Sequence, residues 1–379
     1  MIRSKKNTLR FYLFSIWVVA ISLLLILTLA SSIFNPSLFW PFATLSIGYQ
    51  FIFIINLLNL ILCIYLNRKI AVAPLLVFLL GFYTMTGFYR PGIFVKTRNI
   101  NPDHTAKIMS YNCRLFDFYN WASNKKTRND IVDMLHKENP DILCFQEFFD
   151  SDEIGFRNLK MIDKTMGSYF VHSEFPIILR GKDRYGMATI SRFPIVRKEV
   201  IKNSDSKMNM CLISDVVIEQ DTLRIFNLHL QSVRFNAAEF KFIQNIEEGD
   251  ANQRLVTSKQ VLKRLRNGFI KRKLQVDAIV EKIDASPYPI LLCGDFNDTP
   301  ASYAYRKLSD NLDDAYRVSG KGLSSTYVGP LPFLRIDYIM HDEEVIESES
   351  YKVIRQKFSD HYPIVCNIKI NSTTAEDAE

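Results

Sequence analysis

The most prominent pattern along the chain is an apolar N-terminal region. No charged residue occurs between Phe11 and Asn67, and three apolar segments follow one another there and just beyond. Each has about the 20 residues that cross a bilayer as a helix. We predict three transmembrane helices, at about residues 11–34, 42–66 and 70–89. A cleaved signal peptide would explain only the first, and buried core helices of a soluble protein are the alternative for all three.

Basic residues orient these predicted spans. The N-terminal tail and the Arg68-Lys69 turn are basic, whereas the connection at 31–41 has no charge. Lys and Arg favour the cytoplasmic side of a membrane. An odd number of spans then places everything after Tyr89 on the other side, although Arg90, Lys96 and Arg98 weakly oppose this. We predict an integral protein of the bacterial inner or plasma membrane type, with its larger domain on the non-cytoplasmic side.

Downstream, short strand-like runs alternate with helical segments. We divide the chain into a membrane region (1–95), a polar linker (96–106), an α/β domain (107–370) and a polar tail (371–379) that is predicted to be disordered. The apolar runs that predict strands are residues 107–112, 142–147, 186–193, 223–230, 290–295 and 335–340, with a closing strand after Pro363.

Two helical segments carry specific signals. Ser123 or Asn124 is placed to cap a helix that Pro140 ends. Residues 231–285 predict helices, with Gly268 separating two of them. Between Ala251 and Val276 this segment has eight basic residues and no acid. It is either a solvated helix face or a patch that meets anionic head groups or a phosphodiester backbone.

The positive charge of the chain is concentrated near its N-terminus. The whole sequence has 47 basic and 40 acidic residues, a formal charge of +7. Residues 1–98 contain nine basic residues and no acid, so the remainder has 47 − 9 = 38 basic residues against 40 acidic ones, a formal −2. The charge of the larger domain therefore gives no argument for nucleic-acid binding.

The six cysteines do not form a metal or disulfide pattern. There is no CxxC pair and no Cys/His spacing of a zinc site. Cys144, Cys293 and Cys366 lie inside apolar strand-like runs, which predicts buried thiols.

Polar side chains stand at the ends of several predicted strands. The run ILLCGDFN (290–297) delivers Asp295 and Asn297 two residues apart, so both lie on one side of the chain. An Asx turn explains that pair equally well when it is taken alone. Asp337 lies within the apolar run RIDYIM, where a carboxylate must be paired or bound to a cation. The full set is Asn112, Glu147, Asn227, His229, Asp295, Asn297, Asp337, Asp360 and His361.

This set of side chains indicates one kind of chemistry. Carboxylates and amides with few thiols suit a hard cation such as Mg²⁺ or Mn²⁺. Two histidines with carboxylate partners suit proton transfer and stabilisation of phosphate charge. No P-loop, GxSxG or Rossmann glycine pattern competes. Jointly these residues predict metal-assisted hydrolysis of a phosphoester.

Ordered sequence blocks support this prediction. They read MSYN, FQE, GMATISRFP, NLHLQS, GDFN, STY followed by RIDYI, and SDHYP. In this order, from about residue 106 to 370, the chain resembles the endonuclease/exonuclease/phosphatase superfamily, which includes AP endonucleases, pancreatic-type deoxyribonucleases, inositol polyphosphate 5-phosphatases and bacterial sphingomyelinases. The resemblance implies a four-layer α/β (α+β) sandwich with two packed mixed β-sheets flanked by helices.

The resemblance also implies roles for individual residues. Glu147 would be the main Mg²⁺ ligand, helped by Asn112 and Asp360. Asp295 would orient or deprotonate the attacking water, and Asn297 would hold a phosphate oxygen. The remaining residues would act around the phosphate: His361 would stabilise the transition state with support from Asp337, and His229 would contact the phosphate or assist the leaving group, with Asn227 beside it.

The substrate stays open at this point. AP endonucleases carry an acid two positions after the first Asn, where this chain has Arg114, so abasic-site repair is not expected. A phosphodiester or phosphomonoester in nucleic acid or in a phospholipid head group fits, and no protein partner is implied. Two other hypotheses are a catalytically silent domain that binds a phosphorylated ligand or partner protein, and a transport unit formed by the spans, which the absence of ionisable residues in them disfavours.

Overall fold

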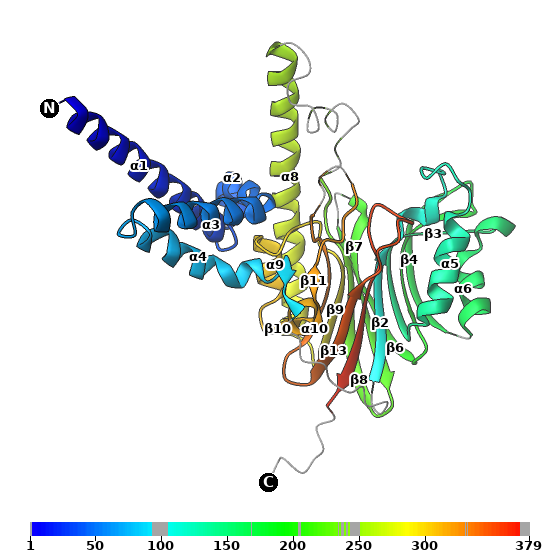
Figure 1. Cartoon of the computed structure of the whole chain (residues 1–379). Coiled ribbons are helices and arrows are strands. Elements are labelled where there is room, and N and C mark those ends of the chain that lie inside the picture. Colours follow the sequence, from blue (N-terminus) through cyan, green and yellow to red (C-terminus); the bar gives the residue numbers. More distant parts are fainter. Residues whose placement is uncertain are drawn as a thin grey trace, which may run out of the picture.

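Two six-stranded sheets packed face to face form the centre of the larger domain, in the computed structural model shown in Figure 1. The structure describes residues 2–92, 105–167, 169–203, 206–233, 251–329 and 333–371, together with the single residues 235, 239, 242 and 331. The predicted linker therefore lies outside the described residues, apart from Thr105 and Ala106 at its C-terminal end. So does the predicted tail, apart from Asn371.

The first sheet has the strand order β13-β14-β2-β3-β5-β4 and the second has the order β10-β12-β9-β8-β7-β6. Only the β2/β3 and β8/β9 pairs are parallel, so both sheets are mixed. The strands of the first sheet are β2 (Thr105–Asn112), β3 (Ile142–Ser151), β4 (Phe170–Leu179), β5 (Asp183–Ser191), β13 (Ile346–Val353) and β14 (Ile364–Ile370). Those of the second are β6 (Ile195–Asn203), β7 (Ser206–Ile218), β8 (Asp221–His229), β9 (Ile290–Asp295), β10 (Leu312–Asp314) and β12 (Asp337–Asp342).

Three apolar layers hold this sandwich together. Between the sheets, Ile108, Ile225 and Leu291 belong to one buried cluster. Outside the first sheet lie α5 (Thr127–Glu138) and α6 (Asn158–Met166), and outside the second lie α8 (Ala251–Asp284) and α9 (Tyr303–Leu308). The predicted four-layer fold with two mixed sheets is confirmed.

All six cysteines are buried and unpaired with one another; the absence of disulfides and the burial of Cys144, Cys293 and Cys366 were predicted. Cys144, Cys293 and Cys366 contribute directly to the apolar layer between the sheets. Their small apolar side chains fit where the two sheets approach each other.

The helix predictions were right in kind and wrong in one boundary. The Asn124 side chain accepts hydrogen bonds from the backbone N–H groups of Lys126 (2.8 Å) and Thr127 (3.2 Å), just ahead of α5. The prediction that Gly268 separates two helices was wrong, because α8 runs unbroken through it. A Cβ at Gly268 would lie 3.3 Å from Nη1 of Arg272, so this glycine makes room for close packing rather than ending a helix.

The N-terminal region contains two helices that are long and apolar enough to cross a membrane, Leu9–Ala30 and Tyr49–Leu66, rather than the predicted three. Its helices are α1 (Ile2–Ala30), α2 (Pro36–Ile47), α3 (Tyr49–Leu66) and α4 (Val72–Met85). The second apolar segment divides at Gly48, which leaves α2 as a separate short helix. The third forms a helix of only 14 residues, because the chain leaves α4 to join the larger domain.

Strand pairing and polar contacts join the segment after α4 to the larger domain. Strand β1 (Tyr89–Arg90) pairs with β11 (Gly322–Leu323), and the backbone N–H of Ser324 donates to the carbonyl of Phe88 (3.1 Å). The Arg317 guanidinium donates to the carbonyl of Tyr83 (2.9 Å) and lies over its ring. The helices are thus attached to the larger domain by strand pairing and polar contacts.

The other contacts come from the same end of the helical bundle. Ser31, just after α1, donates to the carbonyl of Ala301 (3.4 Å), and Thr299 donates to the carbonyl of Ser46 at the end of α2 (3.0 Å). Figure 1 shows α1, α3 and α4 extending away from the sheets on one side. The basic Arg68-Lys69 turn joins the C-terminus of α3 to the N-terminus of α4. It therefore lies at the end of the bundle that is far from the larger domain.

A buried histidine on β4 gives a prediction about acid stability. His172 on β4 is 4% exposed, and its Nδ1 lies 2.8 Å from Oγ of Ser214. Burial lowers the pKa of His172 to about 4, so the folded state resists protonation. Its contribution to stability is therefore complete above the unfolded pKa of about 6.5 and disappears as the pH falls toward 4.

We expect His172→Gln to remove roughly 2–4 kcal/mol of the stability loss between pH 6.5 and pH 4. Urea unfolding of both proteins across this range measures the difference. His136→Gln, on the exposed face of α5, is the matched control and should follow the wild type. Parallel pH curves for the wild type and His172→Gln would contradict the prediction.

Candidate active site

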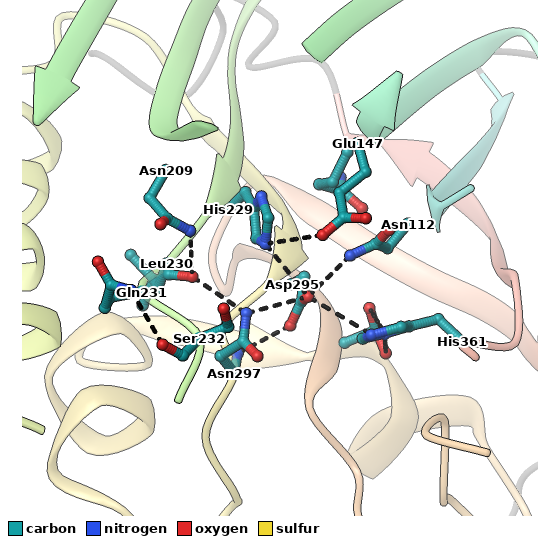
Figure 2. A network of polar contacts seen from close by, with 12 residues as sticks. Asn112, Glu147, Asn209, His229, Leu230, Gln231, Ser232, Asp295, Asn297 and His361 are labelled. Atoms are coloured by element: carbon teal, nitrogen blue, oxygen red, sulfur yellow. Dashed lines mark hydrogen bonds and ion pairs between the residues drawn. The ribbon is translucent and has the colours of Figure 1, made fainter. Parts of the chain in front are cut away.

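Asp295, at the end of β9, is the centre of a polar network between the two sheets (Figure 2). Its Oδ1 accepts a hydrogen bond from the backbone N–H of Asn297 (2.8 Å). Its Oδ2 accepts from the side-chain amides of Asn112 (3.0 Å) and Asn297 (3.1 Å). Asn112 ends β2 in the opposite sheet, so the hydrogen bond to Asp295 links the two sheets where the site is built.

The backbone around Asp295 explains why the turn has this sequence. Gly294 has φ of +142°, and a Cβ there would lie 2.0 Å from the carbonyl oxygen of Leu228 on the neighbouring strand. Only glycine permits this approach. Asn297 has φ of +52°, which asparagine tolerates better than most residues. The residues between the strand and the following loop are therefore selected by backbone geometry as well as by chemistry.

His361 and Asp337 form a buried pair beside Asp295. His361 Nδ1 lies 3.0 and 3.1 Å from the two carboxylate oxygens of Asp337, and its Nε2 lies 3.7 Å from Oδ2 of Asp295. Burial disfavours the charged imidazole, but Asp337 and Asp295 outweigh it and raise the pKa of His361 well above 6.5. These carboxylates favour the protonated imidazole of His361, and its Nε2 is directed at the site.

Glu147 and His229 complete the opposite side of the network. Nε2 of His229 lies 3.7 Å from Oδ2 of Asp295 and 3.9 Å from Oε1 of Glu147. Glu147 has φ of +48° where the β3/β5 pairing shifts register between Phe145 and Phe148, an irregularity that turns the strand. A non-glycine residue in this conformation is uncommon, and here it turns the carboxylate toward His229 and the cavity (Figure 2).

Asp360 lies at the exposed edge of the same site. Its carboxylate is 3.6 Å from Nε of Arg114 and accepts a hydrogen bond from Ser359 (3.1 Å). Ser359 also donates to the backbone carbonyl of Asn112 (2.9 Å). The adjacent residues Asp360 and His361 therefore serve different parts of the site, since only His361 pairs with Asp337.

Asn227 was predicted to stand beside His229 in the site, and the structure places it elsewhere. Its side chain is fully buried, donates to the carbonyl of Ala188 (3.1 Å) and accepts from Gln146 (2.8 Å). Asn227 precedes His229 by two residues on β8, so it lies one full pleat deeper between the sheets. Asn227 therefore joins the two sheets and is absent from the lining of the cavity, as far as the described residues define that lining.

Burial makes Asp295 an unusually basic carboxylate. It is 1% exposed, and desolvation raises its pKa to about 6, against the opposing charges of His361 and His229. The charge of Asp337 adds to the increase, and the hydrogen bond from Asn112 lowers it. A carboxylate with a pKa near neutrality is suited to accept a proton from water.

Two groups of side chains could hold a cation. Asp295, Asp337 and His361 place ligand atoms within 4.8 Å of one another. Nδ1 of His361 already meets Asp337, however, and a protonated imidazole is no metal ligand. Glu147, Asn112 and Asp360 offer oxygen atoms at the wall of the cavity, with the Glu147 and Asp360 side chains 34% and 31% exposed. This second set fits a hard cation that keeps several waters.

These residues line a cavity of about 490 Å³ that reaches beyond the polar network. Of the predicted site residues, Asn112, Glu147, His229, Asp295, Asn297, Asp360 and His361 all contribute to its wall. The rest of the lining comes from the segments after β8 and β9, from α8, from the loop before β12 and from the junction of α2 with α3. No sequence pattern indicated that the N-terminal helices would form part of this cavity.

Two further residues of the site were not assigned roles from the sequence. The Tyr327 ring packs edge-on against His361, with centroids 5.4 Å apart, and the two residues form an isolated β-bridge. The side-chain amides of Asn209 (2.8 Å) and Asn297 (3.0 Å) both donate to the carbonyl of Leu230. The STY block was a signal for Tyr327, whereas Asn209 had none.

Two family models match parts of this chain. The family model described as "Endonuclease/Exonuclease/phosphatase family" matches residues 109–361, and another, described as a domain of unknown function, matches residues 10–88. No curated protein matches the sequence.

Among solved structures, the chain is similar to an endonuclease/exonuclease/phosphatase from Beutenbergia cavernae DSM 12333, with 16% identity, a TM-score of 0.50 and coverage of 72% of this chain and 73% of that one. It is also similar to a family protein from Bacteroides thetaiotaomicron, with 18% identity, a TM-score of 0.50 and coverage of 71% of this chain and 96% of that one. At these identities, the likeness shows the fold alone.

Proposed function

The chain belongs to the endonuclease/exonuclease/phosphatase family, and on that premise we propose that it is a membrane-tethered phosphoester hydrolase that depends on Mg²⁺ or Mn²⁺. The observation that carries this proposal is the buried Asp295 between two histidines, with Glu147 at the wall of the same cavity. Fold alone does not determine chemistry, but this arrangement suits water attack on phosphorus.

Asp295 is the proposed base. With Asn112 and Asn297 donating to it, its carboxylate is fixed in orientation, and its raised pKa lets it take a proton from the attacking water. Asn297, whose amide is held by the Leu230 carbonyl, directs its side chain toward the same region and is the proposed contact to a phosphate oxygen.

Two imidazoles stabilise charge in this proposal. His361, kept protonated by Asp337, places a positive charge next to the position of the phosphate and stabilises the charge that develops during attack. His229, between Asp295 and Glu147, contacts the phosphate or assists the leaving group. The proposed metal ligands are Glu147, Asn112 and Asp360, and a bound Mg²⁺ would neutralise phosphate charge there.

Membrane anchoring is part of the proposal. In the most apolar 18 residues of the helix Leu9–Ala30 only 22% of the residues are buried, and in Tyr49–Leu66 39% are buried. Most of each long apolar helix is therefore exposed. A core helix of a soluble protein buries most of its apolar side chains, whereas a membrane-spanning helix exposes them to lipid. The contacts to the larger domain and the basic Arg68-Lys69 turn lie at opposite ends of the bundle, which supports the catalytic domain lying on the non-cytoplasmic side.

A reporter experiment tests this orientation. A fusion after Tyr89, and another at the C-terminus, should be active with a reporter that works only outside the cytoplasm. A fusion within the Arg68-Lys69 turn should be active only with a cytoplasmic reporter. Cytoplasmic activity of the Tyr89 and C-terminal fusions would overturn the external placement.

An activity survey tests the hydrolase proposal. The full-length protein would be incubated with bis(p-nitrophenyl) phosphate, plasmid DNA, phospholipids and phosphorylated inositols, with Mg²⁺ or with chelator. We expect metal-dependent hydrolysis of at least one of them, and none by the double variant Asp295→Ala, His361→Ala. If no phosphoester is hydrolysed, the catalytically silent, phosphate-binding alternative would replace the proposal.

A further inference from the structure

The cavity that contains the proposed active site is lined by two chemically different groups of residues. One group is the carboxylates, amides and histidines described above. The other is apolar, and apolar surface predominates over the cavity as a whole. The apolar lining consists of Ile47 beside Gly48, Val233 and Phe235 after β8, Val261 and Leu265 on α8, and Leu331, Leu334 and Ile336 in the loop before β12. We call the part of the wall that these residues form the apolar groove.

The apolar groove is continuous with the membrane-proximal end of the helical bundle. Thr44, Ile47 and Gly48 in its wall belong to α2 and its junction with α3, one of the two proposed spans. The outer side of α2 is also apolar, since Leu38 is 86% exposed and Phe39 is 49% exposed. Large apolar side chains in such positions mark a surface that contacts a partner or lipid. The groove therefore begins where the chain meets the bilayer.

Helix α8 forms the facing wall and extends along the same side. It packs against α2, and Figure 1 shows its N-terminal half projecting beyond the sheets, across the direction of α1 and α3. Val261 and Leu265 are four residues apart, so they present one face to the groove. The exposed Leu255 and Leu262 lie among basic residues of this half, a combination that suits contact with anionic head groups.

The charges of the cavity suit a single phosphate group better than a nucleic-acid backbone. Among the described residues that line it, Arg272 is the only Lys or Arg. Its guanidinium is buried, donates to Asp298 (3.0 Å) and donates to the carbonyl of Gln231 (2.8 Å). A polynucleotide requires several cations along its path. The wall of this cavity instead combines acidic residues, among them the proposed metal ligands, with apolar residues that can contact a hydrocarbon chain.

We infer that the substrate is a membrane phospholipid. Its phosphate lies between Asp295, His361 and His229, and one hydrocarbon chain lies in the apolar groove between α2 and α8. This inference rests on the proposed function and adds its substrate class. The bilayer supplies the lipid directly to the groove, because the α2–α3 junction forms part of the groove wall. Hydrolysis adds water across a P–O bond and releases one phosphate-bearing product and one alcohol.

The test measures how the length of the hydrocarbon chain affects the reaction. Full-length protein in nanodiscs would be assayed on dibutyroyl- and dihexanoyl-phosphatidylglycerol, both as monomers in solution, and on bis(p-nitrophenyl) phosphate, which has no hydrocarbon chain. If two added methylenes enter the groove, kcat/KM should rise about tenfold from the shorter lipid to the longer one. The double variant Val261→Glu, Leu265→Glu should lose this rise, so that its kcat/KM values for the two lipids are equal.

The matched control is Leu255→Glu, Leu262→Glu, which changes exposed leucines of the same helix outside the groove. It should keep the dependence on chain length. If both double variants lose that dependence equally, or if the wild type has none, the lipid inference is overturned while metal-dependent hydrolysis of bis(p-nitrophenyl) phosphate upholds the proposed function. Faster cleavage of plasmid DNA than of either lipid overturns the inference in the same way.

A binding measurement decides the inference if no substrate is hydrolysed and the proposed function fails. Calorimetric titration with hexadecylphosphocholine, a single-chain phosphodiester, would be carried out on the wild type and on Val261→Glu, Leu265→Glu. Binding at least about tenfold tighter to the wild type would show that the groove holds a lipid chain. Equal binding to both proteins would contradict the inference that the apolar groove binds a lipid chain.

Discussion

Replacing Asp295 with asparagine should lower kcat for phosphoester hydrolysis by about 10³-fold, because it removes the proposed base. The carboxylate is buried, has its pKa raised to about 6, and accepts hydrogen bonds from Asn112 and Asn297. An amide at position 295 cannot accept a proton from water. The measurement is steady-state hydrolysis of bis(p-nitrophenyl) phosphate by full-length protein at saturating Mg²⁺.

Stability must be followed in the same experiment. Both oxygens of Asp295 accept hydrogen bonds, so the Asn NH₂ group would face a donor and cost about 1–3 kcal/mol. Thermal unfolding separates this loss from the loss of rate. Asp152→Asn, at an exposed position that is 63% accessible, is the matched control and should retain full activity. A folded Asp295→Asn protein with more than about a tenth of wild-type kcat would show that another group is the base.

Replacing Glu147 with glutamine should raise the Mg²⁺ concentration needed for half-maximal activity by about 100-fold, because it removes the proposed charged ligand. The Glu147 carboxylate is partly exposed at the cavity wall, and its backbone already has the left-handed conformation that aims it there. Glutamine keeps the size and hydrogen-bonding capacity but loses the charge. Calorimetric titration of Mg²⁺ into both proteins measures the same change without catalysis.

Glu344→Gln provides the comparison, since this exposed glutamate lies in the turn between β12 and β13, outside the cavity. It should bind Mg²⁺ as the wild type does. Unchanged Mg²⁺ affinity in Glu147→Gln would exclude Glu147 as the main ligand and would favour the Asp295, Asp337 and His361 group as the cation site.

Much of the fold followed from local patterns in the sequence. Apolar runs that end in polar residues predicted β2, β3, β8 and β9, the two parallel pairs that bring Asn112, Glu147, His229 and Asp295 together. Strands with many charged residues were missed. β6, for example, reads IVRKEVIKN and lies at the edge of its sheet. Charged side chains interrupt the alternation of apolar and polar residues there, so the sequence does not read as a strand.

Local patterns misplaced residues whose surroundings depend on distant segments. Alternation along β8 put Asn227 and His229 on the same face, and both do face the opposite sheet. Only His229, at the strand end, reaches the cavity, because Asn227 lies one pleat deeper and is held by β3 and β5. Depth within a sandwich depends on where the strands end relative to one another, which a single strand does not reveal.

The N-terminal helices show most clearly what local sequence patterns cannot predict. Their composition predicted three spans, and the true extent of α4 follows from the pairing of Tyr89–Arg90 with Gly322–Leu323. The contact between Thr299 and the Ser46 carbonyl, which brings α2 to the site, joins residues 253 positions apart. No periodicity within either segment predicts such a contact. The wall that the N-terminal region adds to the cavity was therefore visible only in three dimensions.

In the proposed reaction, Asp295 and a divalent cation direct water at phosphorus. Hydrolysis of bis(p-nitrophenyl) phosphate in ¹⁸O-labelled water, analysed by mass spectrometry of the products, shows which bond is broken and whether the cation and Asp295 are needed. We expect one ¹⁸O atom in p-nitrophenyl phosphate and none in p-nitrophenol, with product formation lost on chelation or in Asp295→Asn. Label in the p-nitrophenol, or equal product formation with and without chelator, would contradict this mechanism.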